Sequence, residues 1–168
     1  MADFATCFPF VLANEDYDPP QYKAVADPTE SDPTAEAIAG INSAFWPAQF
    51  AAILAVAQSE RGPAVAAFYQ ENFWNSWLEQ LVSNKIAAMV LDASVNQGAG
   101  WATKFLQTAC SVEVDGKFGP NTLAAANALP SGVIVPAFIE ARQARYRQVG
   151  GPSLDEWLQR AEKIPAFD

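Results

Sequence analysis

The most hydrophobic helical stretch of the chain reads KIAAMVLDASVNQ, from Lys85 to Gln97. Its apolar residues fall at the spacing of an α-helix packed on a core. Ser83 or Asn84 is placed to cap the start of this helix, and Gly98 can supply a left-handed stop after its end. We therefore predict that residues 85–97 form the central helix of the fold. The side chains expected to be buried are Ile86, Met89, Val90, Leu91 and Ala93.

Proline and glycine residues separate further helical segments on both sides of this stretch. The predicted fold class is all-α, a compact domain of about seven or eight helices with at most one short hairpin, at residues 111–118. On the longest segment, Arg142, Arg145 and Arg147 are expected to point largely outward. Ser153 and Glu156 have the spacing of a capping box for the last helix. The predicted helices span residues 35–45, 48–59, 63–74, 101–110, 121–129, 133–148 and 153–161.

The N-terminal segment predicts a helix that ends in a carboxylate. Phe4, Phe8, Val11 and Leu12 share one helical face, and Glu15 follows them at the helix end. The acidic neighbours Asp16 and Asp18 should raise the pKa of Glu15, because a like charge disfavours ionisation. A glutamate with a raised pKa can act as a general acid near neutral or mildly acidic pH. An acidic cluster after a helix is also typical of a solvated loop start.

Residues 16–36 predict an acidic loop, because Pro19, Pro20, Pro28 and Pro33 each block a helix or a central strand. About twenty residues of loop is longer than packing requires, which indicates a functional or a flexible segment.

The charge and composition of the 168 residues exclude several classes of function. The net charge is −9, and residues 1–60 carry nine acidic residues but one basic residue, which argues against a nucleic-acid partner. The chain contains no histidine, which removes Ser-His and Cys-His catalysis and most zinc sites. We expect no metal and no cofactor. No apolar run approaches the eighteen residues of a membrane span, and the N-terminus shows no signal-peptide pattern.

The two cysteines, Cys7 and Cys110, both lie in apolar helical segments. Buried, unreactive thiols are the default expectation for such positions. A disulfide between them is the alternative.

Several motifs together resemble the bacterial and phage lysozymes of glycoside hydrolase family 108. They are Asn14-Glu15-Asp16-Tyr17, the segment Leu91 to Gly98, and the turn from Val114 to Leu123. The resemblance implies a lysozyme-like fold with a catalytic part at 1–84 and a peptidoglycan-binding part at 85–168, packed into the same globule. In the family a Glu-Gly-Gly-Tyr motif carries the catalytic glutamate, so Glu15 matches the glutamate and Tyr17 the tyrosine. Here the single residue Asp16 replaces the two glycines.

The resemblance implies hydrolysis of the β-1,4 bond between N-acetylmuramic acid and N-acetylglucosamine in peptidoglycan. Glu15 would be the general acid, and such chemistry usually needs a second group. We favour Asp27 among the loop acids, because Asp27-Pro28 also echoes the family. The expected substrate-binding residues are Tyr17, Trp74, Asn96 and Gln97, although a tryptophan such as Trp74 is more often part of a core. The other candidates for the second group are Asp18, Glu30, Asp32 and Glu36.

Two alternatives stay open at this point. One is a non-catalytic wall-binding protein on the same scaffold, and the other is a helical enzyme that cleaves another polysaccharide such as chitin. We expect a monomer that acts on glycan strands in the periplasm or cell wall, exported by a holin, by another secretion route or through lysis. We also expect an acidic pH optimum, because protonation lowers the repulsion between an acidic protein and an anionic wall.

Overall fold

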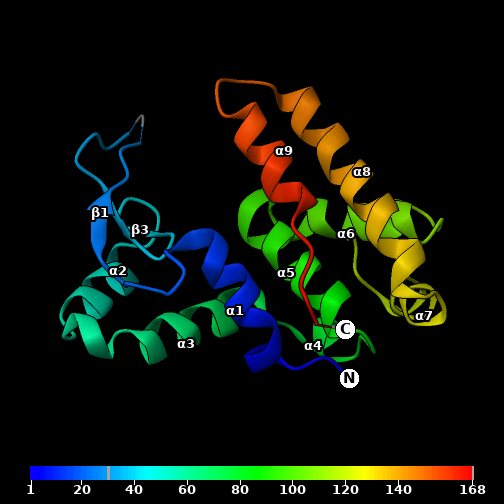
Figure 1. Cartoon of the computed structure of the whole chain (residues 1–168), viewed down its shortest axis with the longest axis horizontal. Coiled ribbons are helices and arrows are strands. Elements are labelled where there is room, and N and C mark those ends of the chain that lie inside the picture. The colour runs from blue at the N-terminus through cyan, green and yellow to red at the C-terminus, as the bar shows by residue number, and fades with distance from the viewer. Residues whose placement is uncertain (30, 168) are drawn as a thin grey trace. The chain divides into compact units, whose positions relative to one another are not determined.

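The computed structural model describes residues 1–29 and 31–167. Within these residues the chain forms nine α-helices, one short 3₁₀ helix and one three-stranded sheet (Figure 1), which confirms the predicted, mainly helical fold class. The helices are α1 (Phe4–Glu15), α2 (Pro47–Leu54), η1 (Gln58–Glu60), α3 (Gly62–Phe73), α4 (Ser76–Glu79), α5 (Asn84–Gln97), α6 (Ala99–Ala109), α7 (Pro120–Ala128), α8 (Ser131–Val149) and α9 (Leu154–Glu162). The strands are β1 (Ala24–Ala26), β2 (Glu36–Ile38) and β3 (Ile41–Asn42).

The chain divides into two compact units. The smaller unit is Phe8–Asn72, and the larger unit combines Met1–Cys7 with Phe73–Asp168. The smaller unit holds most of α1, the sheet, α2 and most of α3, while the larger one holds α4 to α9. The predicted functional division after residue 84 stays a prediction.

Helix α5 is the centre of the larger unit. Its residues from Ile86 to Ser94 are all buried, and α6 and α8 pack against it. The Ser83 hydroxyl accepts a hydrogen bond from the Ile86 amide at 3.3 Å, as expected of an N-cap. The prediction of a central helix over residues 85–97 is therefore confirmed.

A buried ion triad connects α5 to α8 and α9. The Asp92 carboxylate is fully buried and pairs with Arg142 at 2.7 Å and with Arg160 at 2.8 Å. Burial alone would raise the pKa of Asp92, but the guanidinium groups of Arg160 and Arg142 hold it below its usual value. The prediction that Arg142 points outward is wrong, because this buried carboxylate requires a positive partner.

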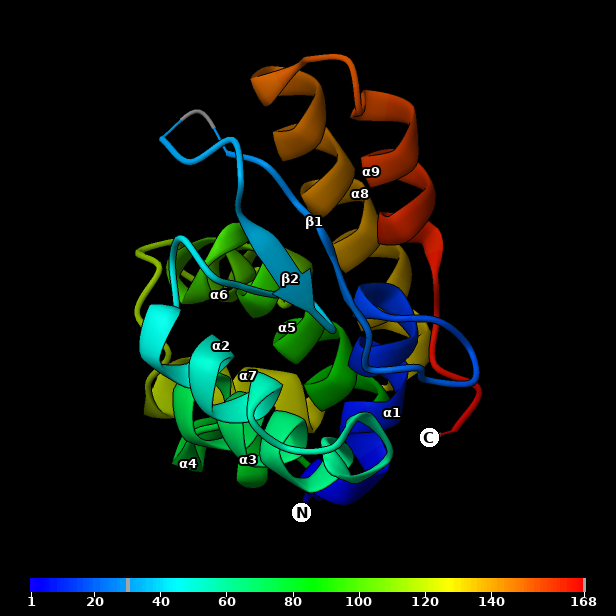
Figure 2. The same ribbon diagram turned by 90° about the vertical axis from the view of Figure 1, so that its left-hand side faces the viewer.

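Helices α8 and α9 pack side by side as an antiparallel pair (Figures 1 and 2). Ser153 precedes α9 with φ −92° and ψ 14°, and its side chain makes no capping hydrogen bond. A capping serine needs an extended backbone, which directs its hydroxyl towards the free amides of the first turn. The predicted capping box of Ser153 and Glu156 is therefore wrong.

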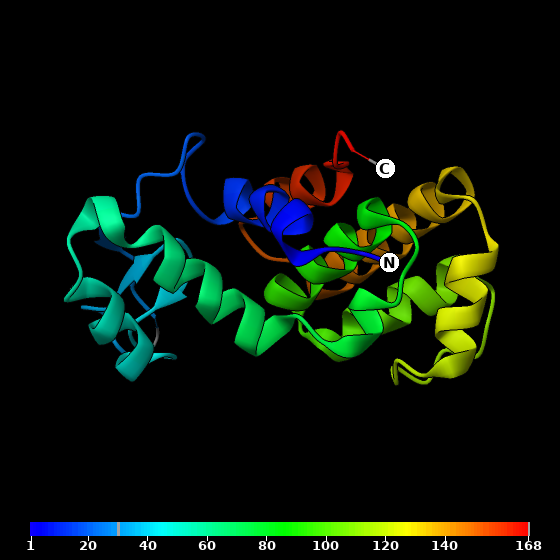
Figure 3. The same cartoon turned by 90° about the horizontal axis from the view of Figure 1, so that it is seen from below.

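The small antiparallel sheet of the smaller unit has the strand order β1-β2-β3. Strands β2 and β3 pair Ile38 with Ile41 and are joined by Ala39 and Gly40, both with positive φ. A two-residue loop of this kind matches the twist of a hairpin. Figures 2 and 3 show the strands, and α2 packs on β2 and β3. The predicted helix at 35–45 is wrong, and β1 lies inside the predicted loop 16–36.

The predicted hairpin at residues 111–118 is also wrong, because the described chain has no strand there. The buried side chain of Gln107 donates to Asp115 Oδ1 at 2.7 Å and accepts from the Gly116 amide at 2.9 Å. Backbone amides of this turn therefore donate hydrogen bonds to side chains and do not pair with a second strand.

Both cysteines are buried and free, so the default expectation for them is confirmed. No helix among the described residues is long and apolar enough to cross a membrane.

Candidate functional site

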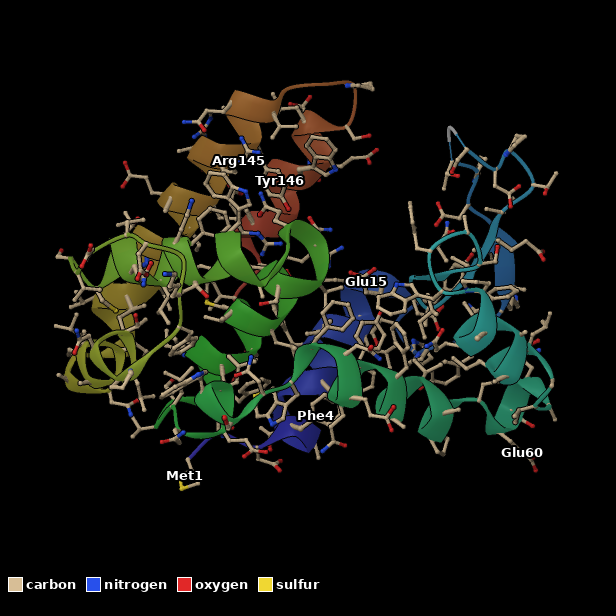
Figure 4. All side chains as sticks on the ribbon, turned by 180° about the vertical axis from the view of Figure 1, so that it is seen from behind. Met1, Phe4, Glu15, Glu60, Arg145 and Tyr146 are labelled. Carbon is tan, nitrogen blue, oxygen red and sulfur yellow. The ribbon has the colours of Figure 1, made fainter. Side chains whose placement is uncertain are left out.

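Glu15 is the last residue of α1 and is half-buried (Figure 4). Within the smaller unit, α1 is fixed by the buried side chains of Phe8, Val11 and Leu12. The Phe8 ring packs on the Tyr69 ring of α3 with 5.3 Å between the ring centroids. The helix end that carries Glu15 is therefore held in position by core packing.

The Ala39-Gly40 turn of the hairpin lies directly against the Glu15 carboxylate. A β-carbon built on Gly40 would collide with Glu15 Oε2 and would come within 2.8 Å of the Tyr69 hydroxyl. That hydroxyl is buried and donates to the Ala39 carbonyl at 2.7 Å. Tyr69 thus fixes the turn, and the absence of a side chain at position 40 leaves room for the carboxylate.

Glu15 lines a pocket of about 370 Å³ within the smaller unit. The first turn of the following loop and the strands β1 and β2 form its walls. Of the predicted site residues, the structure brings together Glu15, Tyr17 and Asp27 in this pocket. The complete lining is Asn14, Glu15, Asp16, Tyr17, Lys23, Val25, Ala26, Asp27, Ala37, Ala39 and Gly40.

Asp27 is held at the pocket wall by a buried amide. The Asn42 side chain, only 4% exposed, donates to Asp27 Oδ2 at 2.7 Å and to the Asp27 carbonyl at 2.9 Å. The Asp27 amide in turn donates to the Ala35 carbonyl at 2.9 Å. The second carboxylate of the pocket therefore has a defined position, set by β3 and by the segment before β2.

Asp16 organises the loop after α1. Its Oδ2 accepts hydrogen bonds from the amides of Gln21 at 2.9 Å and Tyr22 at 2.7 Å. The buried Arg61 donates to the Tyr22 carbonyl at 2.9 Å, so the far end of this loop is also fixed. Burial and the Asp16 charge raise the pKa of the Tyr22 hydroxyl. Asp16, which replaces the glycine pair of the family 108 motif, therefore stabilises the loop that follows α1.

The other candidates for a second carboxylate do not line this pocket. Asp18 and Glu36 are exposed. Asp32 accepts hydrogen bonds from the hydroxyl and the amide of Thr34, which lower its pKa. The candidate Glu30 lies outside the described residues.

The remaining predicted substrate-binding residues belong to the larger unit. Asn96 and Gln97 line a second pocket there. Trp74 lines neither pocket and packs edge-on against Phe4, with 5.7 Å between the ring centroids.

Sequence reasoning missed the positioning roles of Gly40, Asn42 and Tyr69. The available signal was an Ala-Gly pair between two isoleucines, which can form a hairpin turn as well as a helix interruption. The bonds of Asn42 and Tyr69 join residues 15 and 30 positions apart, and no local pattern predicts them.

Two carboxylates in one open pocket can donate and accept protons at a bound substrate. Lys23 is the basic side chain in the pocket lining. No group of three or more metal-ligating His, Cys, Asp or Glu side chains occurs in the described part of the chain.

A family model described as glycosyl hydrolase 108 matches residues 23–98. The match includes Asp27, Gly40 and Tyr69, and it begins after Glu15 and Tyr17. The predicted resemblance to glycoside hydrolase family 108 is therefore confirmed over residues 23–98. The match supports glycoside hydrolase as the class of enzyme.

The fold also has a solved counterpart. The structure of Brucella abortus SagA aligns with a TM-score of 0.60 and 24% sequence identity, covering 94% of this chain and 92% of that chain. At this identity the likeness shows the fold alone. No curated protein matches the chain.

Proposed function

We propose that the protein is a peptidoglycan hydrolase of the muramidase type, with Glu15 as the general acid. One observation carries the proposal: the Glu15 carboxylate lies against the Ala39-Gly40 turn in a pocket that Asp27 also lines. The family match supports glycoside hydrolysis as the reaction class. Peptidoglycan as the substrate rests on the resemblance of the sequence motifs to family 108.

In this mechanism Glu15 protonates the leaving oxygen of the β-1,4 bond. Asp27 then stabilises the oxocarbenium-like state or activates water, the two roles open to the second carboxylate of a glycosidase. The hydrogen bonds from Asn42 hold Asp27 in place before substrate binds, so little reorganisation is needed in the transition state. The exposed ring of Tyr17 can pack against a sugar at the pocket entrance. The proposed place of action is the periplasm or cell wall.

The bond that is cleaved can be identified from the products. Purified protein is incubated with peptidoglycan sacculi and, separately, with chitin, and the soluble products are analysed by mass spectrometry. We expect muropeptides whose new reducing end is N-acetylmuramic acid. Products with a reducing N-acetylglucosamine, or released peptides without new reducing ends, would contradict the proposal. Cleavage of chitin alone would favour a different polysaccharide substrate.

A second candidate is a protein that binds wall glycan without cleaving it. It is favoured by Asp16, which replaces two glycines of the family motif and whose carboxylate is committed to the amides of Gln21 and Tyr22. This candidate predicts that the protein sediments with sacculi while no soluble product forms.

A further inference from the structure

The larger unit has a second pocket, of about 340 Å³, whose chemistry differs from that of the Glu15 pocket. Its lining combines aromatic rings, two amides and one guanidinium, and it includes no acidic residue. The one charged residue of this lining is basic, although the whole chain has a net charge of −9. The lining residues are Asn96, Gln97, Trp101, Arg145, Tyr146, Val149 and Trp157.

Arg145 supplies the positive charge in the lining of this pocket. Its guanidinium lies over the Trp101 ring at 4.2 Å, and the Lys104 ammonium lies 4.7 Å from the centre of the same ring. Arg145 forms no ion pair with any residue that the structure describes. Cation–π contacts hold an arginine in place without cancelling its charge. The pocket therefore presents a positioned positive charge to whatever enters it.

Two residues of α8, Arg142 and Tyr146, hold the two amides of the pocket. Arg142, paired with Asp92 at 2.7 Å, donates to Gln97 Oε1 at 3.3 Å. The Tyr146 hydroxyl donates to Asn96 Oδ1. Figure 4 labels Tyr146 and Arg145, which are adjacent residues of α8.

These bonds engage the oxygen of each amide and leave its NH₂ group to donate elsewhere. Among the described residues, no acceptor receives a hydrogen bond from the side-chain NH₂ of Asn96 or Gln97. Both groups are therefore available to a carbonyl or carboxylate oxygen of a ligand.

The aromatic rings of the pocket suit the apolar face of a sugar ring. Trp157 stacks on Tyr146 with 5.5 Å between ring centroids and an interplanar angle of 27°. Trp157 and Trp101 are both partly exposed, so their indole surfaces can still be covered by a ligand.

We propose that this pocket binds a saccharide that carries an N-acyl group and a carboxylate, with Arg145 as the residue that selects the carboxylate. The indole rings contact the sugar, and the NH₂ groups of Asn96 and Gln97 donate to the N-acyl carbonyl. The identity of the ligand as a muramyl peptide, whose stem supplies the carboxylate, rests on the proposed function. Binding at this pocket requires no cleavage.

The test measures affinity for two matched ligands by calorimetry. They are an N-acetylmuramyl peptide with a free stem carboxylate and the same compound with that carboxylate converted to the amide. The Glu15→Gln protein is used so that no ligand is consumed. We expect the acid to bind at least about tenfold more tightly, because a guanidinium–carboxylate pair forms charge-assisted hydrogen bonds.

Two further variants assign this preference to the pocket. Arg145→Gln should remove the preference for the acid and leave affinity for the amide nearly unchanged. Arg147→Gln is the matched control, because Arg147 is exposed on the same helix, bonds to Gln143 at 3.1 Å and does not line the pocket. Trp157→Phe should lower the affinity for the acid and for the amide by the same factor. This variant still locates binding at the pocket if the Arg145 variant folds poorly.

Equal affinity for acid and amide, or an undiminished preference in the Arg145 variant, would overturn this inference. Cleavage of sacculi by the wild-type protein together with such a result would leave the proposed function intact. If the preference for the acid depends on Arg145 but sacculi are not cleaved, the pocket inference holds and the proposed hydrolase function fails.

Discussion

Gly40 and Glu15 are in such close contact that a β-carbon at position 40 would overlap the Glu15 carboxylate. The hairpin turn and the end of α1 therefore form one unit of structure, although 25 residues separate them in the sequence. This contact gives a direct way to disturb Glu15 without replacing it.

We expect Gly40→Ala to reduce peptidoglycan hydrolysis strongly, because the new methyl group displaces the carboxylate. A displacement of about 1 Å can cost about a hundredfold in rate. The substitution should also destabilise the fold by about 1–2 kcal/mol, because Gly40 has φ +76°. Activity and urea unfolding of the purified variant check both effects.

Gly98→Ala is the matched control for this variant. Gly98 also has a positive φ, +85°, but nothing lies within 4 Å of an added β-carbon. It should show a similar loss of stability and unchanged hydrolysis. Equal losses of activity in the two variants would mean that backbone strain, and not contact with Glu15, explains the result.

Tyr69→Phe should lower kcat by about tenfold or more while KM changes little, because the variant loses the bond that fixes the turn against Glu15. The buried Ala39 carbonyl would also lose a donor, at a cost of about 1–3 kcal/mol in stability. Tyr22→Phe removes a hydroxyl from the same unit outside the pocket lining and should keep its activity. A Tyr69 variant with normal kcat would show that the turn needs no such support.

Asp92→Asn should lower the free energy of unfolding by about 3–5 kcal/mol at pH 7, because it leaves Arg142 and Arg160 without their buried partner. Denaturant titrations measure this loss. Asp155→Asn, at an exposed position of α9, should stay within about 0.5 kcal/mol of the wild type. If Asp92→Asn lowered the free energy of unfolding only slightly, the triad would contribute little to stability.

The triad also predicts a pH dependence with a definite sign. The folded-state pKa of Asp92 lies below the ordinary value of 3.8 that applies to the unfolded chain. The stabilisation by Asp92 is therefore fully present above about pH 4 and is lost as the pH falls through the folded-state pKa. The difference in unfolding free energy between the wild type and Asp92→Asn should be constant from pH 7 to about pH 5 and should shrink below pH 4. A difference that grows on acidification would contradict this assignment.

The two thiols should be nearly unreactive in the folded protein. Burial, together with the charge of Asp3, raises the pKa of Cys7 to about 12, and burial also raises the pKa of Cys110. Alkylation at neutral pH should therefore label neither cysteine until denaturant is added. Mass spectrometry of the unreduced protein should find no disulfide, and a Cys7–Cys110 link would contradict the structure.

Sequence patterns predicted most of the longer helices, because apolar spacing and capping residues depend on nearby positions in the chain. Apolar spacing together with Ser83 and Gly98 placed the central helix to within one residue of its observed bounds. The segment 35–45 was ambiguous, because Ala37, Ile38 and Ile41 fit an inward helical face and also two short buried strands. In the structure Ala39 and Gly40 have positive φ and form a turn, so the segment folds as two strands and not as one helix.

Contacts between distant residues explain what the sequence could not predict. Arg142 lies on an amphipathic helix where arginine is normally exposed, and its buried partner is fifty residues away. Glu15 and Asp27 were both named as candidates, but only the sheet places them in one pocket. Tyr17 lines one pocket, Asn96 and Gln97 line another, and Trp74 lines neither of the two. This distribution also depends on the folded topology.

The central claim is that the Glu15 carboxyl donates the proton that breaks the glycosidic bond. The most direct test compares initial rates of reducing-end release from sacculi for the wild type, Glu15→Gln and Glu60→Gln, where Glu60 is an exposed glutamate of the same unit (Figure 4). We predict a loss of at least about a hundredfold for Glu15→Gln, because a positioned general acid contributes at least this factor. Glu60→Gln should match the wild type. A Glu15→Gln protein that folds normally and hydrolyses sacculi at the wild-type rate would contradict the claim.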